Sequence, residues 1–123
     1  MRLLLCGPDA LEVIDAIASA FGMNGDETHL CDHGLPFERR LEQAQAFAPD
    51  VGVFYLPLDP NGEIEEGRAL LEWRRRVVCL MTDPRSQSVR AEQMGATALL
   101  EAPFDLEALE RAIYGEAALR LRQ

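Results

Sequence analysis

The most informative segment of the chain reads Pro49-Asp50-Val51-Gly52-Val53-Phe54-Tyr55-Leu56-Pro57. Residues 51–56 are almost entirely apolar or aromatic, which predicts a strand that is buried on both faces of a sheet. The segment 57–62 reads PLDPNG, and its prolines, asparagine and glycine favour a turn that ends the strand. The strand therefore delivers one polar-tipped side chain, the phenol of Tyr55, to the end of the sheet.

Four further apolar runs alternate with helical periodicity on either side of this strand. The short runs 3–6, 29–31, 77–81 and 98–100 predict strands. Apolar residues at helical spacing predict five helices, whose first residues or caps are Asp9, Phe37, Ile64, Ser86 and Asp105. In the fourth helix, Val89 and Met94 carry the apolar pattern toward Gly95, a predicted helix stop. Five such units predict a three-layer α/β domain with a doubly wound parallel sheet of strand order 2-1-3-4-5.

The size and charge of the chain suit one soluble domain. Its 123 residues, 48% of them hydrophobic, are enough for a single core without disulfide or metal staples. The formal net charge of -9 and the pI near 4.6 argue against nucleic acid or an anionic membrane as a direct partner. We find neither a signal peptide nor an apolar stretch of about 18 residues, and we expect a cytoplasmic protein. We interpret the basic run 74–76 as a solvated helix end that complements the helix dipole.

The loops that follow the strands converge on one rim, because the carboxyl ends of parallel strands share one edge of a sheet. The strand 3–6 runs into Gly7-Pro8-Asp9, Pro49-Asp50 precedes the strand that ends near Tyr55, Thr82 ends the next strand, and 94–104 reads MGATALLEAPF. In these motifs the chain resembles the receiver domains of response regulators over essentially its whole length. The resemblance implies a flavodoxin-like (CheY-like) fold and a place in two-component signal transduction.

The side chains that a receiver needs in order to be phosphorylated are missing at the matching positions. In the family an acidic pair holds magnesium, an aspartate accepts the phosphoryl group and a lysine binds the product. Here those places carry Gly7 and Pro8, Tyr55, and Ala102, and only the hydroxyl position is retained, as Thr82. A phenol with a pKa near ~10 is neither a ready nucleophile at neutral pH nor a good magnesium ligand. Aspartyl phosphorylation needs all of these missing groups, and we therefore expect that the chain is not phosphorylated in this way.

Other acids on the rim leave an alternative open. Asp9, Asp59 and Asp83 offer carboxylates for a rebuilt metal or phosphate site, although each also fits a structural role as a helix cap, turn former or loop acid. Tyr55 has two interpretations as well. Its ring fills the space of the missing metal cluster while its hydroxyl reaches a polar neighbour such as Thr82, or it belongs to a ligand pocket or a conformational switch.

Cysteines and histidines suggest weaker alternatives. Three cysteines, an odd number, lie in strand-like runs as reduced buried thiols do, and we expect no disulfide framework from Cys6, Cys31 and Cys79. Cys6 resembles the nucleophile of the phosphocysteine carriers in phosphotransferase systems, but Gly7-Pro8-Asp9 lacks the amides of a phosphate cradle. His29, Cys31 and His33 are zinc-ligand types, yet an extended strand spreads them over about 13 Å.

The interpretation that remains is a binding module. We expect an atypical, degenerate receiver (a pseudo-receiver) that acts by phosphorylation-independent protein–protein interaction, with no enzymatic activity, metal or cofactor. The resemblance places its contact surface, for a partner or a second copy, on the fourth helix, fifth strand and fifth helix. The residues of this surface are Arg90, Gln93, Met94, Leu99, Glu107, Glu110 and Arg111. We expect one domain over residues 1–123, in which 115–123 extend the last helix or begin a linker.

Overall fold

A computed structural model describes residues 1–6, 11–31, 35–56, 63–101, 103 and 105–115. Five parallel strands form one sheet in the order β2-β1-β3-β4-β5. The strands are β1 Arg2–Cys6, β2 Glu27–Leu30, β3 Val51–Tyr55, β4 Arg76–Met81 and β5 Ala98–Glu101. The helices are α1 Leu11–Met23, α2 Phe37–Phe47, α3 Glu63–Glu72, α4 Pro84–Met94 and α5 Leu106–Tyr114. The predicted fold class and strand order are confirmed.

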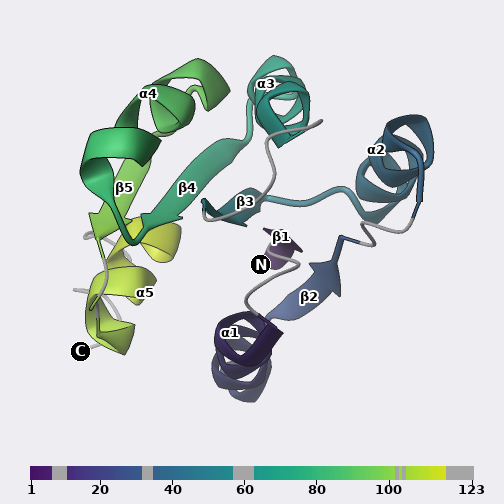
Figure 1. The fold of residues 1–123 in the computed structure, drawn as a ribbon. Helices are drawn as coiled ribbons and strands as arrows, with labels where there is room; N and C mark the ends of the chain where they lie inside the picture. Colours follow the sequence, from purple (N-terminus) through teal and green to yellow (C-terminus); the bar gives the residue numbers. More distant parts are fainter. Residues whose placement is uncertain (7–10, 32–34, 57–62, 102, 104, 116–123) are drawn as a thin grey trace.

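The helices cover the sheet in two layers. Figure 1 shows α1 and α5 on one face and α2, α3 and α4 on the other. Side chains alternate between the faces along each strand, so Leu3 and Leu5 of β1 pack with α1 and α5, whereas Leu4 and Cys6 pack with the other layer. Each fully buried leucine, isoleucine or phenylalanine contributes about 1.5–3 kcal/mol to folding. Two apolar cores, one on each face, therefore hold the sheet in place.

The start of α4 differs from its prediction. Asp83, and not Ser86, is the N-cap, because its carboxylate accepts a hydrogen bond from the backbone N–H of Arg85 at 3.2 Å. Pro84 is the first helical residue, a position where the missing N–H of proline costs nothing. Ser86 instead donates its hydroxyl to the Asp83 carboxylate at 3.0 Å. The helix ends as predicted, at Gly95 with a left-handed φ of 74°.

The basic run 74–76 only partly fits its prediction. Arg74 and Arg75 are exposed, but Arg76 begins β4 and is half-buried. Its guanidinium donates to the carbonyl oxygens of Ala112 and Ile113 in the last turn of α5. The charge of Arg76 therefore complements the carboxyl end of α5, which is far away in the sequence, and not the end of α3 that precedes it.

The other element boundaries agree more closely. β2 lies at 27–30 instead of 29–31, because this edge strand takes its register from β1, in which Arg2 pairs with Glu27. Asp105 caps α5 as predicted, accepting from the N–H of Ala108 at 2.7 Å. The predicted cap Asp9 lies outside the described residues. Within the described ranges, no helix has both the length and the apolar character needed to cross a membrane.

Candidate functional site

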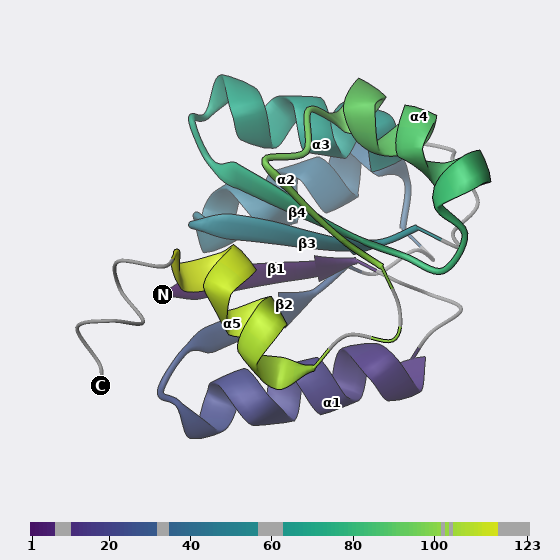
Figure 2. The same ribbon diagram turned by 90° about the vertical axis from the view of Figure 1, so that its left-hand side faces the viewer.

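The strand ends form one rim of the molecule. All five strands are parallel, and Figure 2 shows them running away from the N-terminus toward a shared edge. Register places Cys6 of β1 beside Phe54 of β3, and Tyr55 of β3 beside Leu80 of β4. The end of β3 therefore lies between β1 and β4, where the loops that follow three central strands begin.

Tyr55 occupies the centre of this rim as the last residue of β3. Its side chain is half-buried and packs against the core that lies under α1 and α5. The preceding residue, Phe54, is fully buried on the opposite face. No hydrogen bond joins the phenol to Thr82 in the part of the chain that the structure describes. The main described contact of Tyr55 is thus apolar packing of its ring.

Thr82 follows β4 and is tied to α4 by one side chain. The amide oxygen of Gln87 accepts from the backbone N–H groups of Thr82 at 2.8 Å and of Asp83 at 3.0 Å. The amide nitrogen of Gln87 donates to the Thr82 hydroxyl oxygen at 3.2 Å. Gln87 is buried, with 8% of its surface exposed. The sequence analysis missed this residue, and the only signal for it is a polar side chain one turn into a helix.

Replacing Gln87 by alanine should lower the free energy of unfolding by about 1–3 kcal/mol, because two N–H groups lose their buried acceptor. Chemical denaturation monitored by circular dichroism measures the change. Gln93→Ala is the matched control, since Gln93 is exposed on the same helix and should change stability by less than about 0.5 kcal/mol. Equal effects of the two substitutions would show that the hydrogen bonds of Gln87 to Thr82 and Asp83 do not stabilise the fold.

The structure describes only some of the other residues that were predicted to lie at the rim. Gly7, Pro8, Asp9, Asp59 and Ala102 lie outside the described residues. Asp83 lies at the rim, where its carboxylate is engaged as the α4 cap. Among the described side chains, no group of three histidine, cysteine, aspartate or glutamate residues is arranged to hold a metal ion.

Comparison with known proteins identifies the fold of the chain. No protein-family model and no curated protein sequence matches the chain. Solved structures do match, including a two-component response regulator from Clostridium difficile, with 16% identity, a TM-score of 0.74, and coverage of 100% of this chain and 98% of that one. The chain has the receiver-domain fold. A receiver domain protein from Clostridium thermocellum matches with 16% identity, a TM-score of 0.72 and coverage of 98% and 95%.

A third similar structure is the chemotaxis protein CheY4 of Vibrio cholerae, with 18% identity, a TM-score of 0.69, and coverage of 91% of this chain and 98% of that one. The three matches extend over nearly the full length of each chain. The resemblance predicted from the rim motifs therefore holds at the level of the fold.

The predicted contact surface of the receiver fold is exposed only in part. Met94 is fully buried in the core under α2, α3 and α4, which we call the second core. Its inclusion in the contact surface is therefore wrong, because the last turn of α4 aims it at the sheet. Arg90 is half-buried and donates to the carbonyl oxygen of Leu56 at 3.1 Å, which points it toward β3. Glu110 is half-buried, whereas Gln93 is exposed.

The exposed part of this surface contains apolar residues that the sequence analysis did not include. Leu99 of β5 is 46% exposed, as that analysis expected, but Val89 of α4 at 60% and Leu106 of α5 at 47% are exposed as well. Glu107 and Arg111 form an ion pair of 2.6 Å along α5. We call this exposed set the α4–β5–α5 face; its residues are Val89, Gln93, Leu99, Leu106, Glu107 and Arg111.

The structure describes only two of the three residues of zinc-ligand type that were considered as a weaker alternative. His29 of β2 is half-buried, and its ring packs at a tilt against that of Phe47 of α2, with ring centroids 5.4 Å apart. Cys31 packs against the second core. His33 lies outside the described residues. Each of the two described side chains thus has a packing role.

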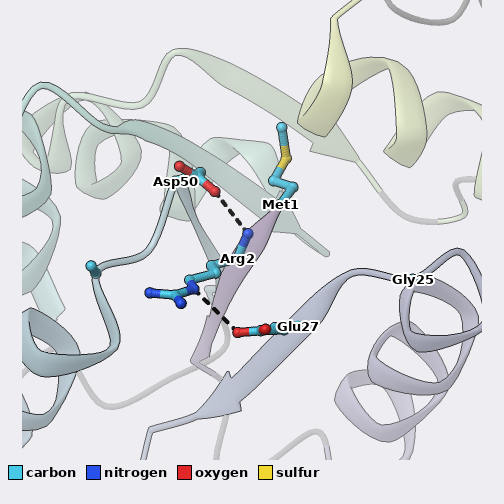
Figure 3. Close-up of a pocket in the computed structure, with 6 residues that line it drawn as sticks. Met1, Arg2, Gly25, Glu27 and Asp50 are labelled. Atoms are coloured by element: carbon cyan, nitrogen blue, oxygen red, sulfur yellow. Dashed lines mark hydrogen bonds and ion pairs between the residues drawn. The ribbon is translucent and has the colours of Figure 1, made fainter.

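A hollow of about 340 Å³ lies at the opposite edge, where the strands begin. Figure 3 shows Glu27 and Asp50 turned toward Arg2, which they flank. The Arg2 guanidinium contacts the Glu27 carboxylate at 3.1 Å, and the backbone N–H of Arg2 donates to the Asp50 carboxylate at 2.8 Å. The Arg2 guanidinium is thus paired with Glu27, and the two contacts tie the starts of β1, β2 and β3 together. The lining residues are Met1, Arg2, Gly25, Glu27, Ala48 and Asp50.

Proposed function

We propose that this chain is an atypical receiver-like signalling domain that acts through protein contacts and without aspartyl phosphorylation. The observation that carries the proposal is Tyr55, a half-buried tyrosine packed into the core at the end of β3. In the receiver fold this strand end is where the resemblance expects the phosphoaccepting carboxylate. The protein is then a binding module and not an enzyme.

The chemistry of phosphoryl transfer supports this proposal. A transferred phosphoryl group needs a nucleophile, and its negative oxygens need a metal ion or cationic side chains. Tyr55 supplies a phenol in place of a carboxylate, and in the sequence Gly7, Pro8 and Ala102 stand where the metal ligands and the lysine are expected. The one retained group, the Thr82 hydroxyl, accepts a hydrogen bond from the side-chain amide of Gln87. A hydroxyl alone neither accepts nor stabilises a phosphoryl group in this chemistry.

The α4–β5–α5 face is the proposed contact surface. Three apolar side chains, Val89, Leu99 and Leu106, stand exposed on three successive elements. Charged and polar residues accompany them, as at the rim of many protein interfaces. The partner is a protein, which includes a second copy of this chain. The net charge of -9 argues against nucleic acid or an anionic membrane as a direct partner.

Affinity capture with surface variants tests the proposed contact. Leu99→Glu and Val89→Glu should each reduce capture of the partner by about tenfold or more, because burying an unpaired carboxylate in an interface costs roughly 1.4 kcal/mol or more. Met23→Glu is the matched control, since Met23 is 89% exposed on α1 in the other layer. Equal capture by all three variants and the native chain would remove the α4–β5–α5 face from the proposal.

A further inference from the structure

Two cysteines meet at the rim, where β1 and β2 end. Leu5 of β1 pairs with Leu30 of β2, and the N–H of Cys31 donates to the Leu5 carbonyl oxygen at 2.9 Å. The two backbones are therefore still paired one residue beyond the end of β2. Continuing the register by one residue brings Cys6 opposite Cys31. Both side chains pack into the same apolar core, so they lie on the same face of the sheet.

The spacing of neighbouring strands suits a disulfide between these positions. Adjacent strands lie about 4.8 Å apart. Disulfides join residues whose Cα atoms are roughly 4.4–6.8 Å apart and whose Cβ atoms are about 3.5–4.5 Å apart. The Cα separation expected from the register is within this range, and the Cβ atoms need to approach by only about 1 Å. Cys31 lies after the last residue of β2, where a small shift disturbs few ladder bonds.

The third cysteine does not fit such a bond. Cys6 pairs with Phe54 of β3, and Phe54 pairs with Cys79 of β4, so one whole strand separates Cys79 from Cys6. Two strand spacings amount to about 9.6 Å, beyond the roughly 7 Å at which a disulfide becomes impossible without backbone movement. Cys79 is fully buried. It therefore serves as an internal control for the other two.

We propose that Cys6 and Cys31 form a redox-sensitive dithiol site that peroxides oxidise to a disulfide joining β1 to the end of β2. All three cysteines are thiols in this structure, which is the reduced state of the site. Cys31 is half-buried and Cys6 fully buried, so the oxidant reaches Cys31 first. In an otherwise reducing compartment such a bond forms only under oxidation and is reversed by thiol reductants.

The reaction proceeds in two balanced steps. The Cys31 Sγ attacks a peroxide oxygen, an S–O bond forms as the O–O bond breaks, and one water leaves with the thiol proton. The Cys6 Sγ then attacks the Cys31 Sγ, an S–S bond forms as the S–O bond breaks, and the hydroxyl leaves as a second water with the Cys6 proton. The two sulfurs lose two electrons in total, which the peroxide gains.

Peptide mapping of the intact protein tests the proposal. The chain contains no lysine, so trypsin cleaves only after arginine and places Cys6 and Cys31 in peptide 3–39 and Cys79 in peptide 77–85. After treatment with hydrogen peroxide and alkylation with iodoacetamide in denaturant, peptide 3–39 should have lost two hydrogens and carry no alkyl group. Peptide 77–85 should be alkylated. Reduction with dithiothreitol before alkylation should restore both labels on peptide 3–39. Fragment ions separate any oxygen on the exposed Met23 from oxidation at sulfur of cysteine.

Three results would overturn the proposal: two alkyl groups on peptide 3–39 after peroxide, oxygen added at its cysteines without loss of hydrogen, or a disulfide between two molecules. Variants sharpen the test. Cys6→Ala should leave Cys31 with added oxygen and no internal disulfide, whereas Cys79→Ala should behave as the native chain. Since Cys6 is fully buried, circular dichroism checks that the Cys6→Ala variant folds, and the native-chain result decides the question without it.

Discussion

Replacing Tyr55 by aspartate is expected to lower the free energy of unfolding by about 2–4 kcal/mol and still to leave the domain unphosphorylated. The loss of stability follows from the half-buried ring, which packs against the core under α1 and α5. Aspartate forfeits this packing and moves a carboxylate toward apolar side chains. Denaturation with guanidinium measures the stability, and intact mass after treatment with acetyl phosphate and magnesium measures the phosphorylation.

The reason for expecting no phosphorylation of this variant is that a carboxylate alone is not a phosphorylation site. Magnesium ligands and a cation for the phosphoryl oxygens are also required, and Gly7, Pro8 and Ala102 supply neither. Tyr55→Phe is the matched control, because it keeps the ring and should change stability by less than about 1 kcal/mol. A phosphoryl group on the introduced aspartate would show that the rim still holds a working metal site.

Stability of the native chain is expected to fall steeply between pH 9 and pH 12 because of one thiol. Burial raises the pKa of Cys79 from its ordinary 9.0 to about 12. In this window the unfolded chain has released the thiol proton while the folded chain retains it, so rising pH favours unfolding. The loss is about 1.4 kcal/mol per pH unit, and it is absent below pH 9, where both states keep the proton.

Cys79→Ala separates this contribution from other groups that titrate in alkali. The variant should be less stable than the native chain at pH 7, because it leaves a small cavity in the second core. Its stability should nevertheless decline less steeply above pH 9. Denaturation curves at half-unit pH steps give both slopes, and parallel slopes would mean that the folded chain does not hold the Cys79 proton.

The fold was predictable because its signals are local and repeated. Apolar runs such as 51–56 and 77–81 are buried on both faces, which only a covered parallel sheet provides. Edge strand β2 has no such run, and its exposed and half-buried side chains left its boundaries to the pairing with β1. The sequence identified that strand but displaced it by one to two residues.

Helix α4 shows where local patterns fail. Its apolar residues are few, so Val89 and Met94 were both placed in its apolar pattern and Met94 also on the contact surface, whereas Val89 is 60% exposed and Met94 is fully buried. Asp83 and Ser86 are both good caps, and the choice between them depends on the position of Pro84. Short polar helices take their rotation from the core they cover, which a single sequence does not display.

Contacts between distant segments were also beyond the sequence. The bond from Arg76 to the end of α5 joins residues 36 and 37 positions apart, and it appears only when β4 and α5 are placed together. Gln87 is close in sequence to Thr82, yet it looks like an ordinary polar helix residue until the fold brings it to the backbone of Thr82. The position of Tyr55 at the rim, in contrast, could be predicted from the sequence, because the apolar pattern of β3 ends at this residue.

The measurement that tests the central claim most directly is the intact mass of the native chain after incubation with magnesium and acetyl phosphate. A receiver domain with its acidic pair, aspartate and lysine in place, run in parallel, must gain a phosphoryl group for the assay to count. This chain is predicted to keep its mass unchanged at every time point. A single phosphoryl adduct that hydroxylamine removes, and that maps to Asp9, Asp59 or Asp83, would contradict the account.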